Sequence, residues 1–202
     1  MSLTYSSMLD LHTDLIAFNL PNVVTEKHFS NHDLDISKPT IIMFICNHCP
    51  YVIHYHEEIV KLAVDFKNDV NLVAISSNDI INYPQDRPEM MKNLWNDLGL
   101  SFPYLFDETQ EIAKNYKAAC TPEFYLFDAN SKLVYRGRMD ESSPGSNIEP
   151  SGIELRDAVN NLLPDENFIC LGDFKAIKIP SDLIEEEKNE KLKEHALILE
   201  EN

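Results

Sequence analysis

The chain has 202 residues, of which 44% are hydrophobic and 25% charged, a composition typical of a folded domain with short extensions. Its formal net charge of −17 argues against binding to nucleic-acid phosphates or anionic membrane surfaces, because both require basic patches. No run reaches the roughly 20 apolar residues of a membrane span, and the N-terminal segment lacks the basic and apolar regions of a signal peptide. We therefore expect a cytoplasmic protein that binds neither nucleic acid nor membrane.

The first half of the chain predicts alternating strands and helices. An extended segment over 15–24 leads into turns and a small hairpin within 25–39. The apolar, β-branched run Thr40–Ile45 is typical of a strand buried on both faces of a sheet. Apolar residues then recur every three or four positions, which predicts one helix over 52–66, and Asn71–Ser76 predicts the next strand.

The middle of the chain predicts two further helices with a short strand between them. The first helix covers 89–98 and the strand covers Tyr104–Phe106. Asp107 and Gln110 have the spacing of a capping box, so we expect the second helix to begin there and to continue to Tyr116.

A hairpin and a final helix complete the predicted domain. Glu123–Asp128 and Lys132–Arg136 are strand-like runs separated by a short turn, which predicts an antiparallel pair. After the Pro/Ser/Gly-rich loop Glu141–Ser151, a core helix is expected over 153–163. The order of these elements predicts an α/β fold, with a mixed central sheet flanked by helices.

The last part of the chain has a different character. Residues 1–164 form the predicted domain, and residues 165–202 form a charged C-terminal extension. Ser181 is suited to cap a helix because acidic residues follow it in the first turn, so we expect a charged, solvated helical tail.

The most informative motif is Cys46-Asn47-His48-Cys49, at the junction of a predicted strand and helix. Unpaired N–H groups and the positive end of the helix dipole stabilise a thiolate at such a junction. A second thiol one helical turn away can resolve whatever the first sulfur forms. The motif therefore favours redox chemistry at sulfur.

Zinc binding and an inert buried pair are the alternatives for two cysteines with this spacing. A zinc site needs a second ligand pair, but Cys120 and Cys170 are single cysteines. His54 and His56 would point in different directions on a helix, which makes a shared metal difficult. We expect no metal, and we expect Cys170 to be buried and structural.

A second motif, Cys120-Thr121-Pro122, directly precedes the predicted hairpin. Together with CNHC after a strand, it resembles the thioredoxin superfamily, in which such a Thr-Pro pair carries a cis-proline packed against the active-site sulfurs. The segments FICNHCPYV, AACTPEFYLFD and KLVYRGRMD resemble those of peroxiredoxin-like, AhpC/TSA-related members of this superfamily, and the resemblance covers residues 15–164. This resemblance implies a thioredoxin-like fold with an extra strand–helix insertion at 78–117, and a redox-active disulfide without any other cofactor.

The resemblance also implies a role for each residue of the two motifs. Cys46 matches the attacking cysteine and Cys49 the resolving one, while Thr121 and Pro122 match residues that hold an extended substrate segment by backbone contacts. His48 precedes the second cysteine, as in strong thiol oxidants and disulfide isomerases. A protonated imidazole there would stabilise the Cys46 thiolate and make the site less reducing than thioredoxin.

Two positions depart from the family patterns. Thr40 lies where thioredoxin keeps a buried acid, so proton transfer needs another group, such as His48 or water. Met43 lies where peroxiredoxins keep a threonine that orients the peroxide, which leaves Arg136 or Arg138 as candidates for a peroxidatic guanidinium.

We therefore expect a thiol–disulfide oxidoreductase that uses Cys46 and Cys49 through a mixed disulfide. Its partners would be a disulfide-bearing protein or a small thiol or disulfide, with an unidentified electron donor or acceptor. The alternatives are a thiol peroxidase in which Cys46 is peroxidatic, and a non-enzymatic metal-binding or protein-binding module. Cys120 is either a third redox thiol or a small apolar filler.

Overall fold

A computed structural model describes residues 8–163, 168–170 and 176–178 of the chain. The chain divides into two compact units, Met1–Leu162 and Leu163–Asn202. In the second unit, β8 (Phe168–Cys170) pairs antiparallel with β9 (Ala176–Lys178). The predicted helical tail and the side chain of Cys170 lie outside the described residues. No helix in the described part of the chain has both the length and the apolar character needed to cross a bilayer.

Seven strands form one mixed sheet in the first unit, in the order β2-β1-β5-β4-β3-β6-β7. The strands are β1 (Asn19–Asn22), β2 (Lys27–Ser30), β3 (Thr40–Phe44), β4 (Asn71–Ser76), β5 (Tyr104–Phe106), β6 (Glu123–Phe127) and β7 (Leu133–Gly137). The central strands β3, β4 and β5 are parallel, whereas β6 and β7 form the predicted antiparallel hairpin on one side. The predicted mixed sheet is confirmed.

The small hairpin lies earlier than predicted. It pairs β1 with β2 and so begins at Asn19, inside the segment expected to be one extended strand. Asn22 makes the turn, because its Oδ1 accepts the N–H of Val24 at 3.0 Å and its carbonyl accepts the N–H of Glu26 at 2.9 Å.

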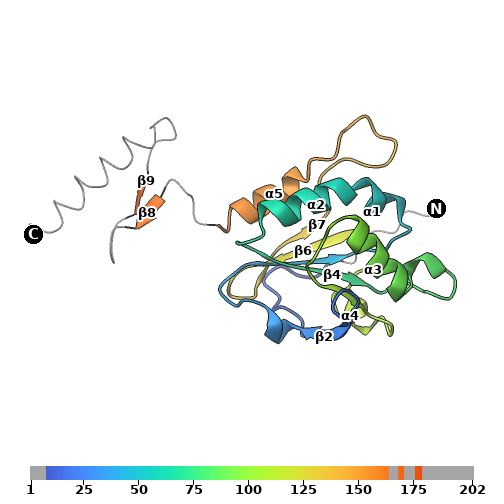
Figure 1. Cartoon of the computed structure of the whole chain (residues 1–202). Coiled ribbons are helices and arrows are strands. Elements are labelled where there is room, and N and C mark those ends of the chain that lie inside the picture. The colour runs from blue at the N-terminus through green and yellow to red at the C-terminus, as the bar shows by residue number, and fades with distance from the viewer. Residues whose placement is uncertain (1–7, 164–167, 171–175, 179–202) are drawn as a thin grey trace, which may run out of the picture. The chain divides into compact units, whose positions relative to one another are not determined.

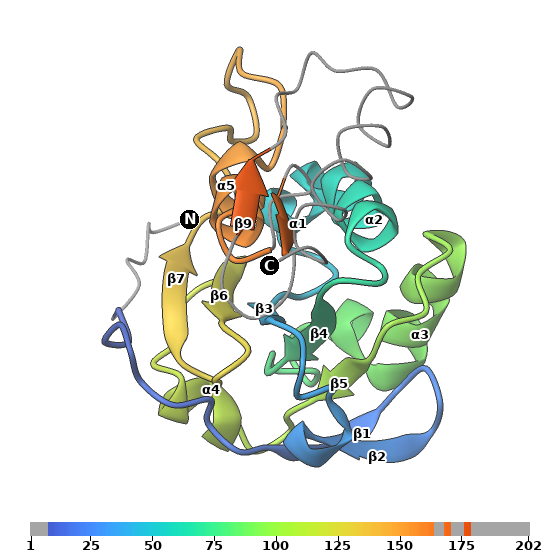
Figure 2. The same ribbon diagram turned by 90° about the vertical axis from the view of Figure 1, so that its left-hand side faces the viewer.

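Helices cover both faces of the sheet (Figures 1 and 2). The helices are α1 (Pro50–His54), α2 (His56–Asp65), α3 (Pro88–Asp97), α4 (Glu111–Asn115) and α5 (Ile153–Asn160), with short 3-10 helices η1 (Asn31–Asp33) and η2 (Pro84–Asp86). Helices α1, α2 and α5 lie over one face, and α4 lies over the other.

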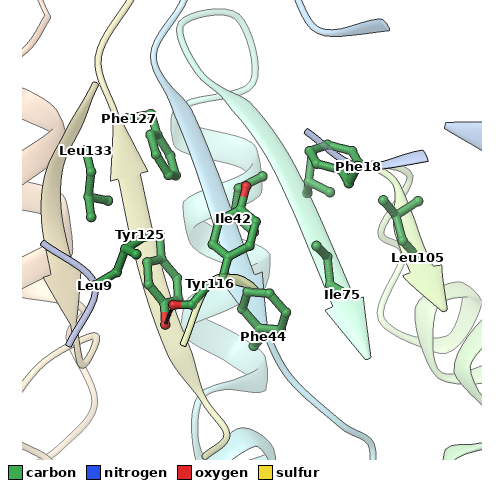
Figure 3. Packing of buried hydrophobic residues seen from close by; sticks show 11 residues of the cluster. Leu9, Phe18, Ile42, Phe44, Ile75, Leu105, Tyr116, Tyr125, Phe127 and Leu133 are labelled. Carbon is green, nitrogen blue, oxygen red and sulfur yellow. Dashed lines mark hydrogen bonds between the residues drawn. The ribbon is translucent and has the colours of Figure 1, made fainter. Parts of the chain in front are cut away.

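The core on the α4 side is built from alternate residues of the central strands (Figure 3). It contains Leu9, Phe18, Ile42, Phe44, Val73, Ile75, Leu105, Tyr116, Tyr125, Phe127 and Leu133. The intervening β3 residues Ile41 and Met43 point to the opposite face and are fully buried there. Burial of β3 on both faces, predicted from its unbroken apolar run, is therefore confirmed.

The helix predicted over 52–66 is interrupted at Tyr55, which separates α1 from α2. The φ and ψ of Tyr55 are −99° and 4°, and its N–H donates to the carbonyl of Val52, only three residues back, at 3.0 Å. The Tyr55 hydroxyl is buried and donates to Oδ1 of Asp140 at 2.8 Å. Apolar spacing does not reveal an anchor of this kind, which is why the prediction of one helix was wrong.

The predicted capping box at Asp107 and Gln110 is also wrong. Gln110 has φ 60° and directly precedes α4, which begins at Glu111. The carboxylate of Asp107 instead accepts the N–H of Ala113 at 3.0 Å and the hydroxyl of Ser77 at 2.8 Å, and so connects α4 to the end of β4. The final helix, α5, ends at Asn160, earlier than the expected position 163.

Candidate active site

The CNHC motif lies where β3 leaves the sheet. The N–H of Ile45 still donates to the carbonyl of Ile75 at 3.0 Å, after which the chain turns through Cys46 to Pro50, the first residue of α1. Cys49 is the N-cap, and its carbonyl accepts the N–H groups of Val52 and Ile53, both at 3.0 Å. Because β3 is buried and α1 begins directly after the motif, both cysteines are held at this end of the sheet.

Thr121 contacts both sulfurs. Its hydroxyl lies 3.5 Å from Sγ of Cys46, and its carbonyl lies 3.2 Å from Sγ of Cys49. The Thr121–Pro122 peptide bond is cis, as the resemblance implied. Both thiols are free, with Cys46 buried at 3% exposure and Cys49 more accessible. The two predicted motifs therefore meet at one dithiol.

The two thiols share a hydrogen bond that separates their acidities. The hydrogen bond from Cys46 lowers the pKa of Cys49 to about 5, and the N–H groups of Val52 and Tyr51 at the start of α1 act in the same direction. The same hydrogen bond and burial raise the pKa of Cys46. In this arrangement the helix terminus favours negative charge on Cys49, whereas the sequence predicted it on Cys46.

The carbonyl of Thr121 acts in the opposite direction. A carbonyl oxygen accepts an S–H hydrogen but repels a thiolate, so the 3.2 Å contact favours a protonated Cys49. The Thr121 hydroxyl beside Cys46 lowers the pKa of that thiol. The dithiol therefore has two arrangements of its single proton, which differ by a transfer between the sulfurs.

His48 lies between Cys46 and a carboxylate that the sequence analysis missed. Its Nδ1 is 3.7 Å from Sγ of Cys46 and 2.5 Å from Oδ2 of Asp86. The ring of His48 stacks on Tyr83, with centroids 4.4 Å apart and planes at 7°. Asp86 ends η2, a segment predicted only as a loop, and no spacing relative to CNHC marks it in the sequence.

Asn47, the other central residue of the motif, is also held by side-chain contacts. Its Nδ2 donates to the carbonyl of Gln85 at 3.0 Å, and its Oδ1 accepts the Tyr104 hydroxyl at 3.2 Å. The ring of Tyr104 packs on Trp95 of α3, with centroids 4.3 Å apart. The predicted insertion therefore supports the CNHC loop from one side.

Three ligand atoms near the dithiol are spaced as metal ligands would be. Sγ of Cys46, Nδ1 of His48 and a carboxylate oxygen of Asp86 lie within 4.8 Å of one another. Oδ2 of Asp86 already accepts hydrogen bonds from His48 and from Asn78. A metal bound by all three side chains would have to replace these hydrogen bonds.

Cys120 is close to the site but chemically different from the dithiol. Burial and then Glu123 raise the pKa of the Cys120 thiol to about 11, which disfavours the nucleophilic thiolate at neutral pH. Cys120 and Thr121 line a cavity of about 300 Å³, which also borders Phe44 of β3 and Lys114 of α4.

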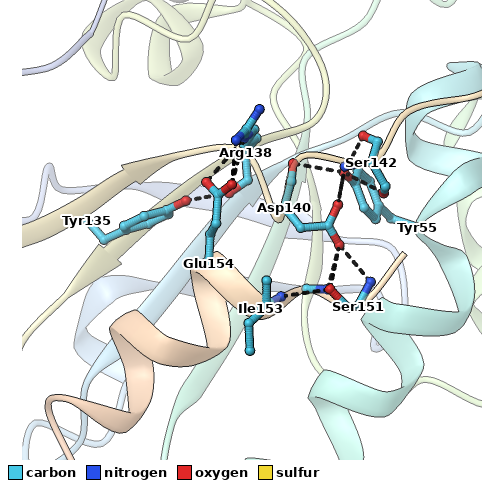
Figure 4. A network of polar contacts seen from close by, with 9 residues as sticks. Tyr55, Tyr135, Arg138, Asp140, Ser142, Ser151, Ile153 and Glu154 are labelled. Atoms are coloured by element: carbon cyan, nitrogen blue, oxygen red, sulfur yellow. Dashed lines mark hydrogen bonds and ion pairs between the residues drawn. The ribbon is translucent and has the colours of Figure 1, made fainter. Parts of the chain in front are cut away.

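None of the residues considered for a peroxidase hydrogen-bonds to Cys46 within the described part of the chain. Met43 is fully buried in β3. Arg138 pairs with Glu154, its Nη2 lying 2.5 Å from Oε1 (Figure 4). Nε and Nη1 of Arg136 are buried without a hydrogen-bond partner among the described residues.

Thr40, in the place of the family acid, is buried and its hydroxyl accepts a hydrogen bond from Asn71 at 3.2 Å.

A polar network that includes Tyr55, the residue between α1 and α2, fixes the loop between β7 and α5 (Figure 4). Oδ2 of Asp140 accepts the N–H groups of Ser151 and Gly152 at 2.7 and 2.6 Å, while its Oδ1 accepts the Tyr55 hydroxyl. His54 contacts the Ser142 hydroxyl at 2.9 Å and so takes part in this network.

Comparison with known proteins identifies relatives of the whole described domain. Residues 14–152 match the family model described as Redoxin. No curated protein sequence matches the chain. A solved structure from Geobacillus kaustophilus, described as an uncharacterized conserved protein, is 47% identical, with 80% of this chain and 86% of that chain covered and a TM-score of 0.78.

Two further structures extend the comparison. A hypothetical protein from Sinorhizobium meliloti 1021 is 35% identical, with 78% of this chain and 86% of that chain covered and a TM-score of 0.75. A secreted disulfide oxidoreductase of Mycobacterium tuberculosis is 19% identical, with 72% and 96% covered and a TM-score of 0.56, which shows a shared fold. The predicted thioredoxin-like fold is confirmed.

Proposed function

The chain belongs to the Redoxin family of the thioredoxin superfamily, and from this premise we propose that it catalyses thiol–disulfide exchange with Cys46 and Cys49. A redox function of the thioredoxin type follows from the family. The dithiol mechanism is our inference. The main support for this inference is that both free thiols contact Thr121, Cys46 at its hydroxyl and Cys49 at its carbonyl.

The reaction proceeds in two exchanges at sulfur. The Cys46 thiolate attacks one sulfur of a substrate disulfide, so that a Cys46–substrate disulfide forms and the other substrate sulfur leaves as a thiolate. Cys49 then attacks Sγ of Cys46 and expels the second substrate thiolate. The substrate gains two electrons, and the protein retains a Cys46–Cys49 disulfide that a dithiol donor must reduce.

Proton transfer between the sulfurs prepares Cys46 for the first exchange. When the proton passes from Cys46 to Cys49, the Cys49 S–H can donate to the Thr121 carbonyl 3.2 Å away. The Cys46 thiolate then accepts from the Thr121 hydroxyl. The carbonyl of Thr121 thus favours a protonated Cys49 and its hydroxyl favours the Cys46 thiolate, although the Thr121 side chain also lowers the pKa of Cys49.

Trapping of the mixed disulfide tests this mechanism and the assignment of the two thiols. Cys49→Ser should accumulate a covalent adduct with a disulfide-bearing peptide at Cys46, whereas Cys46→Ser should form none; mass spectrometry of the intact protein measures both. Cys120→Ser is the matched control and should behave as the wild type, because the raised pKa of Cys120 keeps it protonated. An adduct on Cys49 of the Cys46→Ser variant would reverse the order of attack, and no adduct on either would exclude the mechanism.

Peroxide reduction is the alternative for the same cysteine. Peroxide would oxidise Cys46 to a sulfenic acid. The Cys49 thiol would then condense with this sulfenic acid to give the same disulfide and water. The hydrogen-bond partners of the Cys46 sulfur within the described residues are His48 and Thr121 and include no guanidinium, which disfavours this reaction. Peroxide consumption by the wild type at rates far above disulfide exchange would reverse our ranking, and tight, stoichiometric zinc in purified protein would favour the metal-binding alternative.

The partners follow from the proposed chemistry. We propose a disulfide-bearing protein or a small disulfide as substrate, with a separate thiol donor or acceptor. We retain a cytoplasmic location as part of the same proposal.

A further inference from the structure

Asp86 is a fully buried carboxylate surrounded by hydrogen-bond donors. Oδ1 accepts the N–H groups of Asn47 and His48 at 2.7 and 3.2 Å. Oδ2 accepts from Nδ2 of Asn78 and from Nδ1 of His48, the latter at 2.5 Å. Two consecutive backbone N–H groups of the CNHC loop thus donate hydrogen bonds to one residue of the insertion, about forty positions away in the sequence.

This arrangement fixes the hydrogen on the His48 ring. Because an ionised carboxylate only accepts hydrogen bonds, the contact with Oδ2 places a hydrogen on Nδ1. Nδ1 is also the ring nitrogen that lies nearest to Cys46, 3.7 Å from its sulfur. A hydrogen donated to Asp86 leaves Nδ1 without a lone pair to accept the Cys46 proton.

We propose that Asp86 is a positioning residue of the dithiol site, which holds the CNHC loop and fixes His48 with its hydrogen on Nδ1. This inference rests on the proposed dithiol function, whose chemistry it refines. No hydrogen bond joins the carboxylate to either sulfur among the described contacts, so Asp86 acts on Cys46 through the His48 ring that it orients and through its own charge.

The charge of Asp86 has a second, direct consequence. The negative carboxylate disfavours a thiolate on Cys46, and Nδ1 of the His48 ring contacts both groups. Asp86 therefore favours the oxidised protein, in which no thiolate is present, and His48 reduces that influence.

The substitution Asp86→Asn tests both consequences while keeping the shape of the side chain. Its oxygen can still accept the two backbone N–H groups, but its NH₂ group replaces Oδ2 and donates toward His48. The hydrogen of the ring should therefore move from Nδ1 to Nε2, which long-range ¹H–¹⁵N spectra of the reduced protein detect directly. Equilibration with glutathione should shift about tenfold toward the reduced dithiol, equivalent to ~30 mV.

A double-mutant cycle with His48→Ala separates action through the ring from a general change in charge. His48→Ala alone should shift the glutathione equilibrium toward the oxidised protein. In that background Asp86→Asn should have a larger effect than in the wild type, because no imidazole then remains in contact with both the carboxylate and the sulfur to reduce the influence of the charge. Asp79→Asn is the matched control, since Asp79 is an exposed carboxylate in the same loop that caps Ile81 and Asn82.

The outcomes are distinguishable. An unchanged ring tautomer in folded Asp86→Asn protein, or strictly additive effects of the two substitutions, would overturn the inference. If Asp79→Asn moves the equilibrium as far as Asp86→Asn, the effect is not specific to Asp86 and the inference also fails. A wild type that forms no Cys46–Cys49 disulfide would instead refute the proposed function, and the ring tautomer would still report on the role of Asp86.

Discussion

Thr121 places two atoms of opposite hydrogen-bonding character against the two sulfurs. The hydrogen bond to Cys49 and burial raise the pKa of Cys46, and the Thr121 hydroxyl opposes both. Thr121→Val keeps the β-branched shape but removes the hydroxyl. A lost hydrogen bond to a charged group of about 1.4 kcal/mol corresponds to about one pKa unit, so exchange at pH 7 should slow by up to about tenfold. Thiolate absorbance and exchange rate against pH measure the two effects.

The control for this prediction is Thr121→Ser, which keeps a hydroxyl at the same carbon. It should restore most of the rate and the wild-type pH profile. A valine variant with an unchanged pH profile would show that the hydroxyl does not stabilise the thiolate. In that case the carbonyl of Thr121 would be the atom of this residue that matters for Cys46 and Cys49.

Residues of the site were predictable from sequence where they belong to short motifs. Cys46, Cys49 and Thr121 each lie next to a strand, so the order of elements places them at one end of the sheet. Asp86 was not predictable, because its partners are backbone N–H groups and a ring nitrogen far away in sequence. A lone aspartate after a proline in a loop has no pattern that distinguishes it from a solvated one.

At the scale of elements, strands were easier to predict than helix ends. The β3 run is apolar throughout because both faces are covered, so composition alone identified it. The break at Tyr55 and the start of α4 at Glu111 depend on side-chain hydrogen bonds to other elements, made by Tyr55 and Asp107. Periodicity carries no information about such contacts, and both helix predictions were wrong for that reason.

The break between α1 and α2 provides a stability prediction. Burial would raise the pKa of Asp140, but hydrogen bonds from Ser142, Ser151 and Gly152 lower it well below its ordinary range, and the Tyr55 hydroxyl adds to them. Tyr55→Phe removes one donor from this buried carboxylate and should lower the free energy of unfolding by about 1–2 kcal/mol, measured by urea titration. Tyr51→Phe is the control, because Tyr51 is 40% exposed and should tolerate loss of its hydroxyl.

The pH dependence of the same network has a definite sign. Because the folded pKa of Asp140 lies below its unfolded value, its stabilising contribution is fully present above the unfolded pKa near 3.9 and is lost as pH falls toward the folded one. Because the unfolded state is common to both proteins, the destabilisation caused by Tyr55→Phe should stay nearly constant through pH 4 and diminish only as the pH approaches the folded pKa of Asp140. A loss that stays the same even where the folded Asp140 becomes protonated would mean that Tyr55 stabilises the fold by packing alone.

At the scale of the whole molecule, the dithiol couples stability to oxidation state. The pKa of about 5 at Cys49 lies below the ordinary thiol value near 8.5, so in the reduced protein the folded state binds fewer protons than the unfolded state between these limits. The contribution of the Cys49 thiolate to the free energy of unfolding is therefore fully present above about pH 8.5, and it is lost as the pH falls toward 5. The oxidised protein has no such titration.

The free energy of unfolding of the reduced form, minus that of the oxidised form, should therefore rise with pH from about 5 to about 8.5. Solvent screening at the accessible Cys49 sulfur should keep the slope below about 1.4 kcal/mol per pH unit. Trp95, the single tryptophan, is 1% exposed and packs on Tyr104, so its fluorescence follows unfolding of the domain in urea. Cys49→Ser should abolish the slope under reducing conditions. A difference that stays flat in the wild type would show that no thiolate is stabilised by folding, and would remove the electrostatic basis for exchange at this dithiol.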